Sequence, residues 1–226
     1  MTYPSVTPAV FLSRPNRFVA QVQVGGETQT VHVKNTGRCR ELLVPGAKVW
    51  LTPGQNPKRR TAFDLIAVEK GTMLINMDSA APNAAFGEYA NAGLFLPETA
   101  WVRPEVRYGD SRFDFQIMAG NQLHFAEVKG VTLEENGRTF FPDAPTLRGR
   151  KHLQELMCAR KEGYGAHVVF VIQMAQALSF QPNEKTDPGF AKALRDAAAS
   201  GVSIHAFCCH VTPDSMTIHQ PVPVLL

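Results

Sequence analysis

The spacing of hydrophobic and polar positions changes once along this 226-residue chain, near residue 80. Between residues 17 and 76, short runs alternate apolar and polar side chains and are separated by turns rich in Pro, Gly and Asn, which is typical of β-strands. The alternation predicts five strands: Arg17–Val24, Thr28–Lys34, Ala47–Thr52, Ala62–Glu69 and Met73–Met77. Five strands in about sixty residues fit a small barrel of the oligonucleotide-binding (OB) type, with an SH3-like barrel as the alternative.

From Pro82 onward, longer segments with a helical period alternate with strands. We predict helices at Asn83–Phe95, Thr146–Lys161 and Gly189–Ser200. We predict strands at Glu105–Tyr108, Arg112–Met118, Gln122–Lys129, Ala166–Ile172 and Val202–Phe207. The chain is therefore expected to form two domains, an all-β barrel over residues 1–80 and an α/β domain over residues 81–226.

The composition indicates a folded protein with a sizeable core, since 44% of its residues are hydrophobic and 19% are charged. The most apolar stretch, His167–Ile172, is far too short to cross a membrane, and no apolar signal segment follows a basic start. We therefore expect a cytoplasmic protein without membrane contact. The adjacent Cys208 and Cys209 end an apolar strand, which favours buried reduced thiols over zinc ligands.

Charge is distributed unevenly between the two parts. Residues 1–76 hold ten Lys and Arg against four Asp and Glu, a net charge of +6, whereas residues 77–226 hold thirteen against sixteen, a net charge of −3. A basic barrel ahead of an acidic domain suggests a module that binds a polyanion, followed by a module that carries carboxylates.

The strongest candidate chemistry lies on two neighbouring strands of the second part. Glu127 and Lys129 are two residues apart, so on a strand they point to the same face. Asp114 precedes Glu127 by thirteen residues, which leaves room for a strand, a turn at Gly120-Asn121 and a return strand. A hairpin can therefore bring Asp114 beside Glu127.

Two adjacent carboxylates can hold a hard divalent cation, Mg²⁺ or Mn²⁺, through their oxygens. Such an ion can activate a water molecule and bridge a phosphodiester oxygen, and a neighbouring lysine can offset charge that develops in the transition state. We therefore predict catalytic roles for Asp114, Glu127 and Lys129. The alternative for Glu-x-Lys alone is an exposed salt bridge on an edge strand.

Basic residues gather at two further places. The predicted helix at 146–161 begins with cations, although the helix dipole disfavours them there, and a bound phosphate would account for this. The alternative is a solvated basic face with Glu155 as local partner. The candidate DNA-binding residues are Arg14, Arg17, Lys34, Arg38, Arg40, Lys58, Arg59 and Arg60 in the barrel, and Arg148, Arg150, Lys151 and His152 on the helix.

The chain resembles the sugar fermentation stimulation protein family nearly end to end. The motifs that carry this resemblance are Asn35-Thr36-Gly37-Arg38, Asn56-Pro57-Lys58-Arg59, Glu105-Val106-Arg107-Tyr108-Gly109, Ser111-Arg112-Phe113-Asp114-Phe115, Glu127-Val128-Lys129, Phe141-Pro142-Asp143-Ala144, Lys151-His152-Leu153 and Thr186-Asp187-Pro188. Several such blocks in the right order are far more specific than any one of them.

The resemblance implies an OB barrel fused to a restriction-endonuclease-like core of the PD-(D/E)xK type, DNA binding, and regulation of sugar metabolism, especially that of maltose. It also implies that Asp114 and Glu127 are the acidic pair and Lys129 the lysine of the site. Some nucleases of this superfamily place a further metal-facing carboxylate in the first helix, where this chain has Glu88.

Three functions are compatible with these observations. The leading hypothesis is a DNA-binding protein with a metal-dependent, nuclease-like phosphodiesterase site. The second is a DNA-binding transcriptional regulator without catalytic activity, and the third is a hydrolase of a small phosphorylated metabolite. The acidic pair with its lysine favours the first over the second, and basic residues in both domains favour a polymer over a small ligand.

Overall fold

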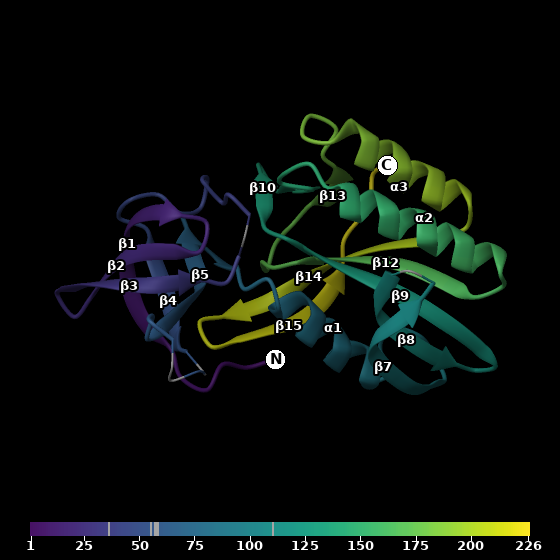
Figure 1. Ribbon diagram of the computed structural model, residues 1–226, viewed down its shortest axis with the longest axis horizontal. Coiled ribbons are helices and arrows are strands. Elements are labelled where there is room, and N and C mark those ends of the chain that lie inside the picture. Colours follow the sequence, from purple (N-terminus) through teal and green to yellow (C-terminus); the bar gives the residue numbers. More distant parts are fainter. Residues whose placement is uncertain (36, 55, 57–58, 110) are drawn as a thin grey trace.

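The N-terminal part of the computed structural model is a β-barrel, seen on the left in Figure 1. The structure describes residues 1–35, 37–54, 56, 59–109 and 111–226. The barrel strands are β1 (Thr7–Asn16), β2 (Val19–Val24), β3 (Glu27–Val33), β4 (Lys48–Pro53) and β5 (Phe63–Lys70), and β6 (Met73–Asn76) follows as a hairpin partner of β5.

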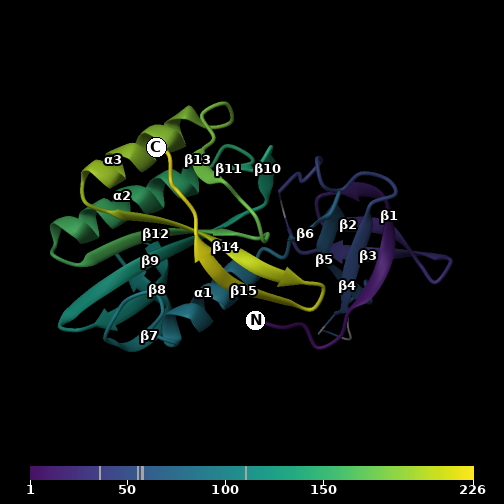
Figure 2. The same ribbon diagram turned by 180° about the vertical axis from the view of Figure 1, so that it is seen from behind.

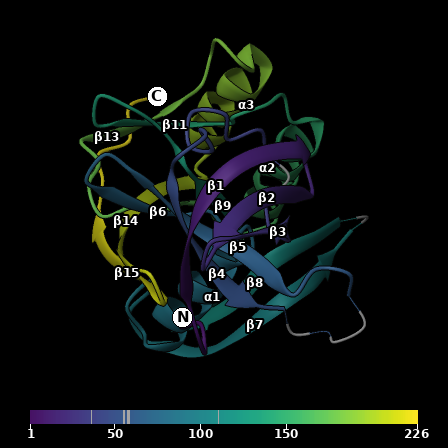
Figure 3. The ribbon, with the colours of Figure 1, turned by 90° about the vertical axis from the view of Figure 1, so that its left-hand side faces the viewer.

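Pairing between β3 and β5 closes the barrel, which has the strand order β1-β2-β3-β5-β4-β1. The β3–β5 pair is parallel, and the other pairs are antiparallel. Side chains that alternate along the strands fill the interior, including Phe11, Val22 and Leu65, each no more than 2% exposed. Figure 3 looks at the molecule from the barrel side. The expected OB-type barrel is confirmed.

The second part is built on a six-stranded mixed sheet in the order β15-β14-β12-β9-β8-β7. Its strands are β7 (Thr99–Tyr108), β8 (Ser111–Ala119), β9 (Gln122–Val131), β12 (Gly165–Ile172), β14 (Ser203–Thr212) and β15 (Ser215–Pro221). Strands β9, β12 and β14 run parallel, and the outer strands pair antiparallel. A small sheet, β10 (Leu133–Glu135), β11 (Arg138–Phe141) and β13 (Ser179–Pro182), adjoins it.

Helices cover both faces of this sheet, as Figures 1 and 2 show from opposite sides. The helices α2 (Leu147–Lys161) and α3 (Pro188–Ala199) lie together on one face, and α1 (Ala81–Asn91) lies on the other. Two separate apolar cores result, one including Phe113, Leu153 and Phe170, the other including Phe86, Phe115 and Val169. No helix in the described part of the chain is both long and apolar enough to span a membrane.

The sequence pattern located all three helices and most central strands within a few residues, but it missed five strands. The missed strands are β1, β10, β11, β13 and β15. Strand β1 contains Pro8 and Pro15, which remove ladder donors, and it is extended because β2 and β4 pair with its two edges. Cys208 and Cys209 are buried, as expected, and neither forms a disulfide bond.

Candidate active site

The β8–β9 hairpin brings the predicted acidic residues together. Its turn is Gly120-Asn121, as the sequence predicts, and Gly120 adopts a positive φ of 55° that suits glycine. The ladder pairs Ala119 with Gln122 and ends where Phe115 faces Ala126. Asp114 and Glu127 come next on the two strands, so they lie where the strands separate.

Beyond the end of the ladder, the carboxylate of Asp114 accepts a hydrogen bond from the backbone of β9. Its Oδ2 accepts a hydrogen bond of 2.8 Å from the backbone N–H of Val128. Its Oδ1 accepts one of 3.0 Å from the side-chain amide of Asn83, near the start of α1. A strand and a helix therefore fix both carboxylate oxygens, and they hold Asp114 beside the backbone that carries Glu127.

Glu127 lies inside the molecule, with its side chain only 3% exposed. Its Oε1 accepts a hydrogen bond of 2.5 Å from the Lys129 ammonium, whose side chain is 18% exposed. The same oxygen contacts Nδ1 of His152, which reaches across from α2. The predicted same-face placement of Glu127 and Lys129 is confirmed. Glu127 is buried, Lys129 is partly buried, and β9 is an inner strand, so the alternative of an exposed salt bridge on an edge strand is wrong.

The two carboxylates have pKa values shifted in opposite directions. Burial raises the pKa of Asp114, and the negative charge of Glu127 raises it further. Burial also works to raise the pKa of Glu127, but the hydrogen bond from His152 and the charge of Lys129 outweigh it and hold this pKa below its usual range. The surroundings therefore favour the ionised form of Glu127 more than that of Asp114, which is the easier carboxylate to protonate.

One atom of this cluster is left for a ligand. The Oε2 of Glu127 is buried, and among the described residues it has no hydrogen-bond partner. A buried carboxylate oxygen without a partner costs free energy, and a divalent cation would satisfy it. The donor set therefore fits a hard cation, although the described residues contain no group of three or more His, Cys, Asp or Glu that could hold one. Water would have to complete the coordination.

Glu88 does not join this site, which corrects the expectation for a third metal ligand. Its side chain is 60% exposed, and its carboxylate pairs with the N-terminal ammonium of Met1 at 2.5 Å. The helix turns by about 100° per residue, so Glu88, five residues after Asn83, points to a different side of α1. Asn83 is the residue of α1 that contacts the site, and no short motif marks it in the sequence.

His152 also has a different role from the predicted one. Its side chain is 6% exposed and faces Glu127, so it does not belong to a DNA-binding surface. Its Nε2 accepts a 3.4 Å hydrogen bond from Nε of Arg148, which leaves Nδ1 to donate to Glu127. The helical face expected to be fully solvated or bound to phosphate therefore turns partly inward at this residue.

Gly130, directly after Lys129, lets β9 approach its neighbours closely. A Cβ atom at this position would lie 2.5 Å from Oε1 of Gln173 and 2.7 Å from Cγ of Pro82. Gln173 in turn donates to the backbone carbonyl of Asp78 and to the side chain of Asn76, at the end of the barrel. The glycine thus lets the site strand, α1 and the barrel pack together.

The basic residues named from the sequence fall into two groups. Protein groups already hold several: Lys34 pairs with Asp78, Arg59 with Asp64, and Arg150 with the buried Asp187, while Arg14 donates to backbone carbonyls. Within the described ranges, no ion pair is formed by the side chains of Arg17, Arg38, Arg40 and Arg60. Lys58 lies outside the described residues. Their role in DNA binding stays a prediction.

Two family models match the chain. An SfsA N-terminal OB domain matches residues 12–77, and a sugar fermentation stimulation protein RE domain matches residues 80–215. The matched ranges correspond to the barrel and to the part built on the six-stranded sheet.

Relatives and a solved structure agree with these models. A sugar fermentation stimulation protein homolog from Clostridium beijerinckii is 47% identical, with both chains covered in full. A homolog from Desulfitobacterium hafniense strain Y51 is 50% identical and covers all of this chain and 99% of its own. The solved structure of Pyrococcus furiosus SfsA, described as a complex with Ca²⁺, is 28% identical, has a TM-score of 0.91, and covers 100% of this chain and 98% of that one. The chain therefore belongs to the sugar fermentation stimulation protein family.

Proposed function

We propose that this protein binds DNA and hydrolyses phosphodiester bonds at a metal-dependent site formed by Asp114, Glu127 and Lys129. The observation that carries the proposal is the buried Glu127, which is held by Lys129 and His152 while its second oxygen has no partner in the described structure. An unsatisfied buried acceptor costs about 1–3 kcal/mol, which a cation bound to Glu127 Oε2 would recover.

Each residue of the cluster has its own role in the proposed reaction. Glu127 Oε2 and Asp114 are the groups that would hold Mg²⁺ or Mn²⁺, and the Ca²⁺ complex of the relative from Pyrococcus furiosus supports a cation site in this family. A bound cation would lower the pKa of a water molecule and stabilise charge on the phosphate. Lys129 lies 2.5 Å from Glu127, so its ammonium is placed to offset negative charge on the reacting phosphate.

His152 and Asn83 act on the site as positioning residues. His152 donates from Nδ1 and fixes the orientation of the Glu127 carboxylate, and Asn83 fixes that of Asp114. Both residues lie on helices from opposite faces of the sheet, so the two carboxylates are held independently of each other. This support keeps the carboxylates in place when a substrate enters.

The OB domain and the excess positive charge of residues 1–76 support DNA as the partner. The cationic residues lie on both domains, so the nucleic acid would contact the barrel and the site domain together. The family name connects its members with sugar fermentation, and we propose a DNA-directed role for this chain in the regulation of sugar metabolism.

The test is cleavage of duplex, single-stranded and branched DNA with Mg²⁺ or Mn²⁺. The wild type should cleave at least one form, and Lys129→Ala should lose cleavage while keeping most of its DNA affinity. Glu127→Ala should lose cation binding as well, measured by calorimetry. Lys192→Ala, which alters an exposed lysine on α3, is the matched control and should behave as the wild type.

A regulator without catalytic activity would give a different result. Such a protein would bind DNA tightly and cleave no form with either ion. Cleavage that persists in Glu127→Ala would point to a contaminating nuclease and would count against the proposed site.

A further inference from the structure

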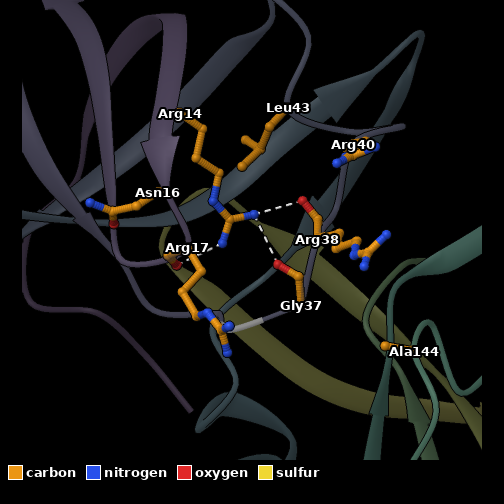
Figure 4. A pocket seen from close by; sticks show the side chains of 8 residues that line it. All are labelled: Arg14, Asn16, Arg17, Gly37, Arg38, Arg40, Leu43 and Ala144. Atoms are coloured by element: carbon orange, nitrogen blue, oxygen red, sulfur yellow. Dashed lines mark hydrogen bonds between the residues drawn. The ribbon is translucent and has the colours of Figure 1, made fainter.

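A pocket of about 460 Å³ lies where the barrel approaches the segment before α2. It is lined by Arg14, Asn16, Arg17, Gly37, Arg38, Arg40, Leu43 and Ala144. Figure 4 shows the arginine side chains around this space, with Ala144 on a separate segment from the second domain. Half of the lining residues are arginines, which is the composition of an anion site rather than of an apolar ligand pocket.

Arg14 links the backbone segments that surround this pocket. Its guanidinium donates to the carbonyls of Gly37 and Arg38 at 2.9 and 2.7 Å, and to those of Arg17 and Asn35 at 2.8 and 2.7 Å. These bonds tie the β1–β2 turn to the loop after β3. Arg17 and Arg38 extend from the two segments that Arg14 joins, as Figure 4 shows.

The charge of the other three arginines is available to a ligand. In the part of the chain that the structure describes, barrel cations such as Lys34, Lys48 and Arg59 pair with carboxylates. By contrast, the side chains of Arg17, Arg38 and Arg40 are exposed, and within the same described residues they have no ion pair. The pocket therefore brings three guanidinium groups without an ion pair to one place.

Two carboxylates offset part of this charge. Asp143 lies against the backbone of Gly37, and both Asp143 and Glu41 act on the neighbouring Cys39 thiol, whose pKa is raised to about 12 by burial first and by these charges second. Four guanidiniums against two carboxylates leave an excess of two positive charges. A phosphomonoester carries about −1.5 to −2 at neutral pH, whereas each phosphodiester carries one negative charge.

The size of the pocket also selects one nucleotide rather than a duplex. Pockets for single small ligands measure about 300–1,000 Å³, and this one falls in that range. Phe18 follows the lining residue Arg17 in the sequence. Its side chain is 53% exposed, and the Arg17 guanidinium lies 5.9 Å from the centroid of its ring. An exposed ring next to a phosphate site offers a face on which a base can stack.

We propose that this pocket binds a phosphomonoester on a nucleotide, either the terminal phosphate of a single strand or a free nucleotide. The strand-end form rests on the proposed function, since it makes the pocket the subsite that recognises the end of a DNA substrate. Arg17, Arg38 and Arg40 contact the phosphate, and Arg14 holds the two segments that carry them.

The experiment measures binding of one fluorescent single-stranded oligonucleotide by anisotropy, in EDTA to suppress cleavage. Unlabelled competitors of the same sequence carry a phosphate at the 5′ end, at the 3′ end or at neither end, and adenosine monophosphate is a fourth competitor. For the wild type, one phosphorylated end should compete at least tenfold better than the unphosphorylated strand. Competition by adenosine monophosphate alone would identify the free nucleotide as the ligand.

The double variant Arg38→Ala/Arg40→Ala should lose this preference, because it removes two of the proposed phosphate contacts. Both side chains are exposed, so the variant should still fold. Arg195→Ala, an exposed arginine on α3, is the matched control and should keep it. Equal competition by all strands together with no competition by adenosine monophosphate would overturn the proposal, as would an equal loss for phosphorylated and unphosphorylated strands in the double variant. If either of these results were found while the wild type still cleaved DNA with a cation, the phosphate pocket would be refuted and the proposed function would stand. Absence of both binding and cleavage would refute the proposed function too.

Discussion

Two charged clusters of this molecule are built in opposite ways. Around Glu127, charges of both signs are buried and neutralise one another, and helices on both sides of the sheet hold them. Around Arg38, exposed side chains carry an excess of positive charge, and Arg14 holds their backbone by hydrogen bonds to carbonyl groups. The first arrangement fixes the position of a few atoms for chemistry, and the second attracts an anion from solution. Changes in the two clusters should therefore affect different properties.

Glu127→Ala should have the largest effect on stability. It leaves the Lys129 ammonium partly buried without its partner and removes the acceptor of His152. Breaking a buried ion pair costs about 3 kcal/mol or more, so the free energy of unfolding measured with urea should fall by that amount. Glu88→Ala removes an exposed carboxylate and should stay within about 0.5 kcal/mol. Equal effects of the two changes would show that burial does not distinguish these carboxylates.

Cation binding should stabilise the wild type by a similar amount. At a concentration of Mg²⁺ or Mn²⁺ about one hundred times its dissociation constant, the free energy of unfolding should rise by about 2.7 kcal/mol. The melting temperature should rise accordingly and return after chelation. Asp114→Asn keeps an acceptor for the Val128 N–H but loses the charge, so its melting temperature should not respond to the ion. A full response in this variant would remove Asp114 from the cation site.

Variants of Arg150 test whether a basic residue that pairs with a buried carboxylate also contributes to DNA binding. It pairs with buried Asp187 at 2.5 Å, so Arg150→Ala should lower the free energy of unfolding by about 1–2 kcal/mol and leave DNA affinity nearly unchanged. The next residue, Lys151, is exposed and pairs with Glu155 only at 3.6 Å, so Lys151→Ala should change the free energy of unfolding by less than about 0.5 kcal/mol and should lower DNA affinity. A large loss of DNA affinity in Arg150→Ala would place it on the binding surface.

The same pair should make stability depend on pH. Burial works to raise the Asp187 pKa, but the N–H groups of Thr146 and Phe190 and the Arg150 guanidinium outweigh it and hold this pKa below its usual range. Its contribution is therefore complete above the unfolded pKa near 3.9 and is lost as pH falls through the lower folded value. Asp187→Asn should flatten the acid limb of urea unfolding measured from pH 5 downward. An unchanged limb would exclude Asp187 as its source.

Arg38→Ala should have the smallest effect on stability, within about 0.5 kcal/mol, because the side chain is exposed and its backbone carbonyl still accepts from Arg14. Its effect should appear in DNA binding, where the slope of log affinity against log salt should fall by about 0.7–0.9 for one lost phosphate contact. An unchanged slope would exclude Arg38 from the DNA surface.

Local pattern located the parts of the site that depend on one hairpin. The Gly120-Asn121 turn fixes the β8–β9 register, and the two-residue strand period places Glu127 and Lys129 on one face. These features need only neighbouring residues, so the sequence carries them. The same holds for the helix at Leu147–Lys161, where Thr146 accepts from the Gly149 N–H as the N-cap.

The sequence by itself indicated a β-barrel followed by an α/β part, and it placed Asp114, Glu127 and Lys129 on one hairpin. Only the tertiary structure decided what surrounds that set: Asn83 contacts Asp114, His152 turns inward to Glu127, and Glu88 pairs with the N-terminus instead. It also decided which cations are paired and which surround the pocket. The reason is that strand and helix periods follow from local stereochemistry, whereas the partner of a charged side chain depends on which distant segment folding brings within hydrogen-bond distance.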